Sequence, residues 1–433
     1  MNKLKLIAQR AKQDKKLKFT SLAHHINAES LAEYYKLLKR DKACGIDGVT
    51  IEEYGSNLQN NITQLVDQLK AKKYKAVPVR RTFIPKATSK ELRPLGIPAT
   101  QDKLVQMALK TIVECIFEPM FLDCSHGFRP NKGCHTALRQ LDNVMKNKPI
   151  NYIVEVDIRK FFDTVDHAWL MRCLRERIVD PNLLRLIEIQ LKAGVMEATT
   201  LHETNEGTPQ GGIISPLLAN IYLHYVLDLW FEKKFKLSAK GYTELIRYCD
   251  DFVVVCELKS DAEMFLSIAQ ERLAKFNLKF AMEKTRIAET GKQAWWRKRY
   301  KGIKPDTITF LGFTMYLKAT RTGWFRVQFK TAKTNLSRKL KKFKEWLQNL
   351  GNQISLEYAW KGIKSRINGH YNYFGVNGNM YSLRKYYHCC IWMIFEWINR
   401  RSQRKSMNYK QFNKYLNQNP LPTPSVKVQI WNS

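Results

Sequence analysis

The sequence predicts an α+β fold, in which a small antiparallel sheet lies among helices and is followed by a basic, helical C-terminal region. Two apolar, β-branched runs, LIRYCD and DFVVVCEL, meet at a pair of aspartates within residues 245–258, as the strands of a hairpin would. Four prolines within residues 76–100 exclude a helix there and favour short extended segments. From about residue 325, apolar residues recur at helical spacing between lysines.

The other elements follow from the same patterns along a chain of 433 residues, which is long enough for two or three domains. Residues 1–75 are predicted to be helical and charged, with a glycine-containing loop at residues 43–50. YIVEVDI, residues 152–158, predicts a buried strand. Further helices are predicted over residues 101–122, 166–196, 215–235 and 261–276, and further short strands over residues 276–287 and 308–317.

The charge of the chain indicates a polyanionic partner. Lys and Arg number 73 against 39 Asp and Glu, and the resulting net charge of +34 is typical of proteins that bind nucleic acid. Residues 321–433 hold 21 Lys and Arg against 3 Asp and Glu, together with 20 aromatic residues. No run of 18 apolar residues occurs, so no membrane span is expected. Nine cysteines without framework spacing predict a reducing cytoplasm.

Two groups in this basic region are candidates for contact with nucleic acid. Residues 329–350 combine an apolar helical face with lysines, and Lys339, Lys342 and Lys344 are expected to contact phosphates. The alternative is an ordinary solvated helix face. Tyr371 and Tyr373, in the segment GHYNYFGV, are expected to contact the nucleic acid by stacking.

Three aspartates predict a metal site. Asp157 ends the strand YIVEVD, and Asp250 and Asp251 lie at the junction of the predicted hairpin. Burying a carboxylate is costly unless it is paired or bound to a metal, and an all-oxygen site suits Mg²⁺. Two such ions about 3.5–4 Å apart activate a hydroxyl and stabilise a leaving pyrophosphate, which is polymerase chemistry. On spacing alone, a nuclease remains open.

The order of several motifs resembles the reverse transcriptases, and closely those of the group II intron type, over nearly the whole chain. The resemblance implies a right-hand polymerase fold. Residues 1–150 would form an N-terminal extension and fingers with part of the palm, residues 151–320 the palm, and residues 321–433 an all-helical thumb or maturase-like RNA-binding domain. The motifs are GIDGVT (45–50), HGFRPNKG (126–133), VDIRKFFDTVDH (156–167), EGTPQGGIISPLLAN (206–220), RYCDDF (247–252), FLGFT (310–314) and GHYNYFGV (369–376).

The resemblance also assigns roles to residues. Asp157, Asp250 and Asp251 would hold two Mg²⁺ ions. The incoming dNTP would be clamped by Lys86 and Arg93. Phe162, five residues after Asp157, would exclude a ribose 2′-hydroxyl and so favour dNTPs over NTPs.

Four further residues have roles near the template and primer. Gln210 would touch the nucleotide or template, Gly211 and Gly212 would let the backbone approach the base pair, and Lys284 would face the primer strand. Cys249 stands where the family usually has alanine.

The implied reaction is cDNA synthesis from dNTPs on a bound, structured non-coding RNA, with a DNA or RNA primer, in a bacterial cytoplasm. Two settings remain open, a group II intron and antiviral defence. The alternative function is a maturase that acts mainly as a splicing chaperone. The sequence does not indicate an oligomeric state.

Overall fold

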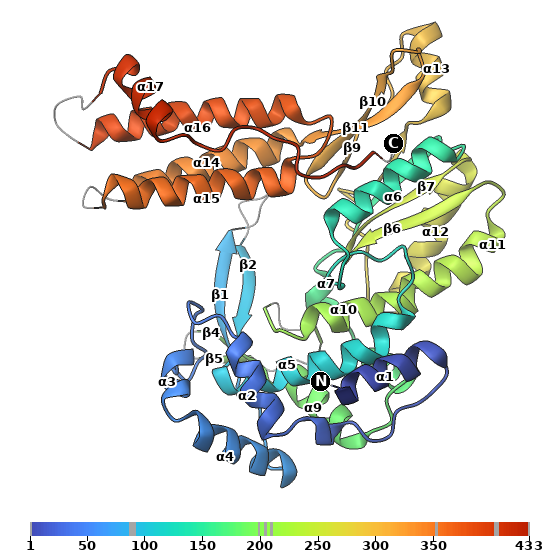
Figure 1. Cartoon of the computed structure of the whole chain (residues 1–433). Helices are drawn as coiled ribbons and strands as arrows, with labels where there is room; N and C mark the ends of the chain where they lie inside the picture. The colour runs from blue at the N-terminus through green and yellow to red at the C-terminus, as the bar shows by residue number, and fades with distance from the viewer. Residues whose placement is uncertain are drawn as a thin grey trace. The chain divides into compact units, whose positions relative to one another are not determined.

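The computed structural model describes residues 2–85, 92–197, 200–202, 206–207, 211–350, 354–401 and 407–431. The chain forms two compact units, each built from separate stretches of sequence (Figure 1). Unit 1 comprises Met1–Gly133, Val156–Val254 and Ser260–Arg286. Unit 2 comprises Cys134–Glu155, Val255–Lys259 and Ile287–Ser433.

The N-terminal part of unit 1 is helical, as predicted. Helix α3 begins at a capping box in which Thr50 and Glu53 each bond the other's backbone N–H, so two otherwise unpaired donors are satisfied. Helix α5 forms the core of this part, with most of its side chains buried. The elements are α1 (Asn2–Gln13), η1 (Ala23–His25), α2 (Ala28–Leu37), α3 (Ile51–Ser56), α4 (Leu58–Lys70), α5 (Thr100–Phe117) and η2 (Glu118–Met120).

The predicted proline-rich strands are β1 (Val79–Pro85) and β2 (Leu92–Ile97), which pair antiparallel with Arg80 opposite Ile97. The sheet order is β2-β1-β4-β5, with β4 (Val195–Glu197) and β5 (Thr200–His202). Strand β2 is therefore an edge strand, where Pro94 costs no ladder hydrogen bond. Strand β4 is parallel to β1, and β5 is antiparallel to β4.

The rest of unit 1 surrounds the glycine-rich and aspartate motifs. The predicted helix over residues 215–235 is continuous in hydrogen bonding but includes two π-helical segments, η3 and η4. The elements are α7 (Phe161–Thr164), α8 (His167–Arg175), α9 (Pro181–Leu191), α10 (Ser215–Leu223), η3 (His224–Asp228), η4 (Phe231–Phe235), α11 (Lys236–Ser238), β6 (Thr243–Tyr248), β7 (Asp251–Cys256) and α12 (Lys259–Ala274).

A second four-stranded sheet carries the predicted aspartates. Its order is β6-β7-β3-β8, with β3 (Tyr152–Asp157) and β8 (Arg286–Glu289). Only two residues join β6 to β7, so these neighbours run antiparallel, as predicted. The backbone N–H of Asn151 donates to the carbonyl of Cys256 at 3.1 Å, so the start of β3 lies beside the end of β7 and these strands are also antiparallel.

Unit 2 contains a three-stranded sheet, ordered β11-β10-β9, and long helices. Helix α14 buries Leu336, Phe343 and Leu347 on one face, as its periodicity predicts. The elements are α6 (Cys134–Asn147), α13 (Lys292–Lys301), β9 (Ile308–Phe310), β10 (Phe313–Ala319), β11 (Phe325–Thr331), α14 (Lys333–Asn349), α15 (Leu356–Phe374), α16 (Met380–Arg400) and α17 (Tyr409–Gln418).

An extended C-terminal segment packs back onto unit 2. The N–H of Lys427 donates to the carbonyl of Gly375 at 2.6 Å, and Val428 forms a bridge with Val376. Farther along, Ile430 donates to Asn377 Oδ1 at 2.7 Å. The segment therefore joins the end of α15 through backbone hydrogen bonds.

Several predictions of local structure are wrong. The helix predicted over residues 166–196 is divided into α8 and α9 and is followed by β4 from Val195, and the strand predicted over residues 308–317 is two strands, β9 and β10. Residues 321–433 are not all helical, because Phe325–Thr331 forms β11 and pairs with β10 along seven residues. Residues 276–287 do not form a strand over their length. Only Phe280 bridges Ile158, and β8 begins at Arg286. The α+β class and the small antiparallel sheets are confirmed, while the three-domain division stays a prediction.

Candidate active site at the edge of the aspartate-bearing sheet

The three predicted aspartates lie at one edge of the sheet β6-β7-β3-β8. Asp157 ends β3, and Asp251 begins β7 next to it. Because these strands are antiparallel, the register set at Asn151 and Cys256 brings Asp157 opposite the turn that contains Asp250. Each of the three residues is half-buried. Two neighbouring strand ends therefore place three aspartates at one edge of the sheet.

The turn between β6 and β7 has an unusual backbone. Cys249 has φ +59°, in the left-handed region that side chains seldom adopt, and it is buried. Gly127, of the HGFRP motif, lies so close that a Cβ atom there would stand 2.7 Å from the Cys249 nitrogen. The turn is therefore packed against a second motif, which fixes its conformation.

Arg247 holds this turn from beneath. It is completely buried, and each of its five side-chain N–H groups has an acceptor. Nη1 donates to the carbonyl of Cys249 at 3.0 Å. The other acceptors are Asp228 Oδ1 at 2.7 Å, Asp228 Oδ2 at 2.5 Å, Asn220 Oδ1 at 3.0 Å and Ser125 Oγ at 2.8 Å. A buried polar network thus fixes the aspartate turn relative to α10, η3 and the HGFRP segment.

Lys284 lies on the other side of Asp157. Its Nζ is 2.5 Å from Asp157 Oδ2, so an ammonium group occupies the carboxylate edge where a cation would bind. Within the described residues, no group of three His, Cys, Asp or Glu side chains is arranged to hold a metal ion as it stands. The three carboxylates nevertheless form an all-oxygen donor set, and Asp157 already accepts a cation. This chemistry fits a divalent ion such as Mg²⁺.

Phe162 lies next to the glycine-rich motif. It is half-buried in the short helix α7, and its ring meets Phe161 edge-on at 5.4 Å. Gly207 lies against its backbone, since a Cβ atom at Gly207 would stand 2.9 Å from the Phe162 carbonyl oxygen. His167 also bonds the carbonyl of Gly207, at 2.5 Å. The structure thus brings the predicted selectivity residue beside Gly207, the first residue of the GTPQGG motif.

Gly211 and Gly212 are the last two residues of the GTPQGG motif and precede α10. Gly211 has φ +111°, and a Cβ atom there would stand 2.5 Å from the carbonyl oxygen of Gly96 in β2. Only glycine fits such a position. Gly212 is buried. In the structure, the backbone at Gly211 lies close to β2. The expected approach of Gly211 and Gly212 to a base pair stays a prediction.

A chain of buried hydrogen bonds links the same loop to β1. Ile213 donates to Gln106, Gln106 to Gln190 and Gln190 to the Tyr74 hydroxyl, at 2.7, 2.8 and 2.7 Å. Tyr74 in turn donates to Asp102, whose pKa is raised to about 6 by burial. This chain couples the position of the glycine-rich loop to the start of the β1–β2 hairpin.

Three predicted dNTP contacts are only partly described. Lys86 and Gln210 lie outside the described residues. Arg93 is in β2 opposite Ile84, and only its backbone is described. Their predicted roles stay predictions.

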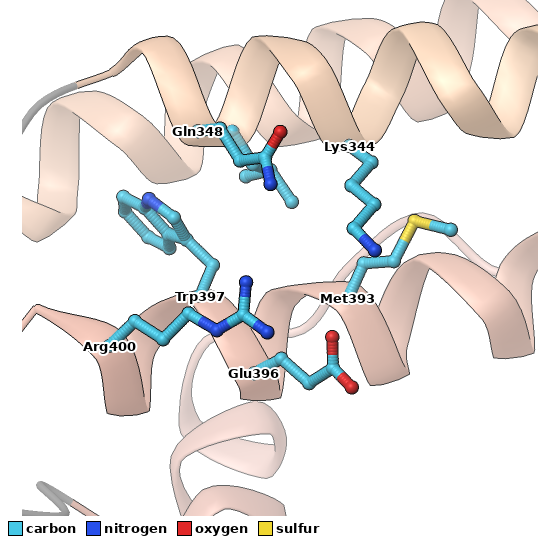
Figure 2. Close-up of a pocket in the computed structure, with 7 residues that line it drawn as sticks. Lys344, Gln348, Met393, Glu396, Trp397 and Arg400 are labelled. Atoms are coloured by element: carbon cyan, nitrogen blue, oxygen red, sulfur yellow. The ribbon is translucent and has the colours of Figure 1, made fainter.

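The predicted lysines of α14 do not share one surface. All three are exposed, but Lys339 and Lys342 do not line the pocket between α14 and α16. Figure 2 shows that Lys344 instead projects toward α16, where it lines this pocket with Met393 and Glu396. Lys344 is therefore separated from the other two lysines.

The two predicted tyrosines also differ. Tyr371 is completely buried in α15, which contradicts the prediction that its ring contacts nucleic acid. Burial also raises the pKa of its hydroxyl. Tyr373 is partly exposed, stacks on Phe313 at 5.9 Å and donates to the carbonyl of Leu311 at 3.0 Å. Tyr371 therefore belongs to the helical core, whereas Tyr373 supports the FLGF turn.

Arg247 and Asp228 were not predicted from the sequence. The signal for Arg247 was present, because it is a charged residue inside the apolar run LIRYC. Asp228 gave a similar signal, since it is the one Asp, Glu, Lys or Arg among residues 219–231, ANIYLHYVLDLWF. Their pairing is a property of the fold.

Comparison with known proteins bears on this site directly. The reverse transcriptase (RNA-dependent DNA polymerase) family matches residues 84–315, more than half of the chain and all three aspartates. The chain belongs to the reverse transcriptase family. Among the described helices of this reverse transcriptase, none is both long and apolar enough to cross a bilayer.

Its relatives confirm the group II intron type. The group II intron-encoded protein LtrA of Lactococcus lactis subsp. cremoris is 41% identical over 207 residues, 48% of this chain and 34% of LtrA. Protein YkfC of Escherichia coli (strain K12) is 32% identical over 333 residues, 69% of this chain and 83% of YkfC. A 91 kDa protein in the cob intron of Schizosaccharomyces pombe is 34% identical over 216 residues, 50% and 26% of the two chains. The match thus spans about a third of LtrA.

Proposed function

We propose that this chain is an RNA-directed DNA polymerase that synthesises cDNA from dNTPs on a bound, structured RNA. The observation that carries the proposal is the placement of Asp157, Asp250 and Asp251 at one sheet edge, beside a turn that the buried Arg247 holds through the carbonyl of Cys249. Family membership over residues 84–315 supports it. Right-hand fingers, palm and thumb domains are part of the same proposal.

The three aspartates would hold two Mg²⁺ ions. Bound there, the ions would activate a primer 3′-hydroxyl and neutralise the leaving pyrophosphate. The protein's own contribution is to hold the carboxylates in place before substrate binds, through the Arg247 hydrogen bond to Cys249. Lys284, which now pairs with Asp157, would then be free to contact the primer strand.

Substrate selection rests on residues around this edge. Phe162 would exclude a ribose 2′-hydroxyl, and Lys86, Arg93 and Gln210 would contact the dNTP. The partly exposed ring of Phe162, next to the glycine-rich segment, supports its part in this scheme.

The test is primer extension by the double variant Asp250→Ala with Asp251→Ala. We expect loss of dNTP incorporation with unchanged RNA affinity, because the carboxylates bind metal while affinity comes from Lys and Arg elsewhere. A matched control, Asp41→Ala with Glu271→Ala, removes two exposed acids outside the site and should extend normally. Extension above a few per cent of the parent by the first variant would contradict the assignment.

The RNA partner is proposed to be an intron RNA or a dedicated non-coding RNA. The name of LtrA, a group II intron-encoded protein, favours the first. A bacterial, cytoplasmic setting is supported by the LtrA and YkfC relatives and by nine free cysteines. Sequencing the RNA that copurifies with the chain distinguishes an intron from an antiviral setting.

The second candidate function is a maturase that acts mainly as a splicing chaperone. The exposed, basic surface of α14 favours an RNA-binding role independent of the aspartates. Splicing of the copurified RNA with the Asp250→Ala, Asp251→Ala variant separates the functions, since a chaperone needs no catalytic carboxylates.

A further inference from the structure

Helix α13 carries aromatic and basic residues that the polymerase site does not use. Its sequence, KQAWWRKRYK, contains three aromatic residues and five Lys or Arg, and no acid. Trp295 is buried, and its ring lies 6.2 Å from Phe325 of β11. This contact fixes α13 on the β10–β11 hairpin, with which it lies in Figure 1.

The anchoring leaves other rings on the surface. Trp296 stacks on Tyr300 at 5.9 Å with an interplanar angle of 20°, and it meets Trp324 of the hairpin edge-on at 6.0 Å. Tyr300 is 76% exposed and Trp324 55% exposed. We call these three residues the α13 platform. Two elements thus present a continuous aromatic surface to solvent.

The cations around the platform have few acidic partners. Across the described residues, Arg297 is the one cation of α13 that pairs with an acid, Glu289. Arg299 instead lies 5.5 Å over the Trp296 ring. Beyond the helix, Lys304, Lys318 and Arg321 are also exposed. The surface therefore combines flat apolar faces with positive charge that the chain itself does not neutralise.

We propose that the α13 platform binds an unpaired segment of RNA. Exposed rings stack on bases whatever their sequence, and neighbouring Lys and Arg contact the phosphates between them. Inside a duplex the base faces are stacked on one another, so apart from its ends a duplex would leave the rings without a stacking partner. Charge complementarity selects a polyanion over a neutral protein surface. This contact does not depend on the polymerase site and goes beyond the proposed function.

The structure provides a matched control in the same unit. Tyr381 and Trp392 of α16 are also exposed, at 80% and 56%. Trp392, however, donates to the acid Glu396 at 3.0 Å, and neither ring stacks on the other in the manner of Trp296 and Tyr300. The α16 pair therefore exposes its rings to a similar extent as the α13 platform but lacks the stacked arrangement of Trp296 and Tyr300.

The experiment uses the full chain and a fluorescent single-stranded RNA of about eight nucleotides, near the size that one stacking site covers. Tyr300→Ala with Trp324→Ala should weaken its binding about tenfold, while affinity for a blunt duplex of the same sequence changes less than about twofold. Tyr300→Phe with Trp324→Phe keeps both ring faces and should bind like the parent. Tyr381→Ala with Trp392→Ala should also bind like the parent.

Crosslinking locates the contact. A single-stranded RNA that contains 4-thiouridine should crosslink to tryptic peptides that hold Trp296 or Trp324. Unchanged single-strand affinity in the Ala variant, an equal loss on the duplex, or an equal loss in the α16 control would each overturn the proposal. So would crosslinks that omit both peptides.

Discussion

The guanidinium of Arg247 and the carboxylate of Asp228 form a completely buried, two-pronged ion pair, with Nε–Oδ1 at 2.7 Å and Nη2–Oδ2 at 2.5 Å. Burial lowers the pKa of Arg247, but the adjacent Asp228 more than offsets this and holds that pKa above its usual value. Arg247 thus stays charged beneath the turn that carries Asp250. Of the three remaining donors of Arg247, one binds the carbonyl of Cys249 in the turn and the other two bind Asn220 and Ser125, so this ion pair connects the core to the site.

Arg247→Met should destabilise the chain by about 3–5 kcal/mol, because Asp228 would remain buried without its partner. Arg247→Met with Asp228→Leu removes both charges and should recover much of this loss. The double variant should still have a lower kcat for dNTP incorporation, with KM less affected, since no donor holds the Cys249 carbonyl. Chemical denaturation and primer extension measure the two effects. Parent-like kcat in a folded double variant would show that the pair is only structural.

Phe162→Ala should raise rNTP incorporation relative to dNTP by about 10- to 100-fold, because a ring that excludes the 2′-hydroxyl would be lost. Phe162→Tyr keeps the ring and should retain discrimination. The measurement is single-nucleotide extension with each substrate. If the ratio does not change in Phe162→Ala, the ring is a packing residue and selection lies elsewhere.

Lys339→Gln with Lys342→Gln should reduce the salt dependence of RNA binding. Each lost phosphate contact removes roughly 0.7–0.9 from the slope of log K against log salt, so the slope should flatten by about 1.5. Lys344→Gln should change the slope less, because the side chain of Lys344, although exposed, projects toward α16. Affinity titrations across a salt series test both. Equal effects of all three lysines would show that the position of Lys344 beside α16 does not limit its contact with RNA.

His224 predicts a loss of stability in mild acid. Burial lowers the pKa of this histidine from 6.5 to about 4, with Asp228 at 4.0 Å partly opposing that shift and Arg247 reinforcing it. The folded state therefore disfavours protonation of His224. The contribution of neutral His224 to the stability of the chain is fully present above pH 6.5 and is lost as the pH falls toward 4.

Between pH 7 and pH 5 the loss from this group is about 2 kcal/mol. His224→Phe removes the titration and fills the space beside Phe121, so the variant should lose about that much less stability over the same range. Denaturant unfolding of both proteins at the two pH values provides the comparison. Identical pH dependence would show that His224 has the same pKa in the folded and the unfolded chain.

The sequence was sufficient for features that depend on local pattern. The β6–β7 hairpin, the strand ending at Asp157 and the proline-rich strands all follow from apolar alternation and turn residues. The resemblance to the reverse transcriptases then assigned the three aspartates to one site. Their common edge follows from antiparallel pairing, which a strand–turn–strand pattern specifies.

Other features depend on tertiary contacts. Arg247 and Ser125 lie 122 residues apart in sequence, and no local pattern pairs them. Tyr371 and Tyr373 share one motif, but a two-residue step on a helix turns about 200°, so one ring enters the core and the other leaves it. The same step separates Lys342 from Lys344. Strand β11 was not predicted, because its sequence FRVQFKT is short and its polar positions include the basic residues Arg326 and Lys330.

The discontinuous make-up of unit 2 has a consequence for synthesis on the ribosome. Helix α6 leaves the ribosome early, with Leu138, Leu141 and Val144 on its buried face. Strand β11, against which it packs, and Gln429, which accepts from Arg139, follow long afterwards. At ordinary translation rates of roughly 5–20 residues per second, the apolar face of α6 stays without its β11 partner for tens of seconds. During that interval it is a target for chaperones and for aggregation, so slower elongation before residue 325 should reduce the yield of folded enzyme.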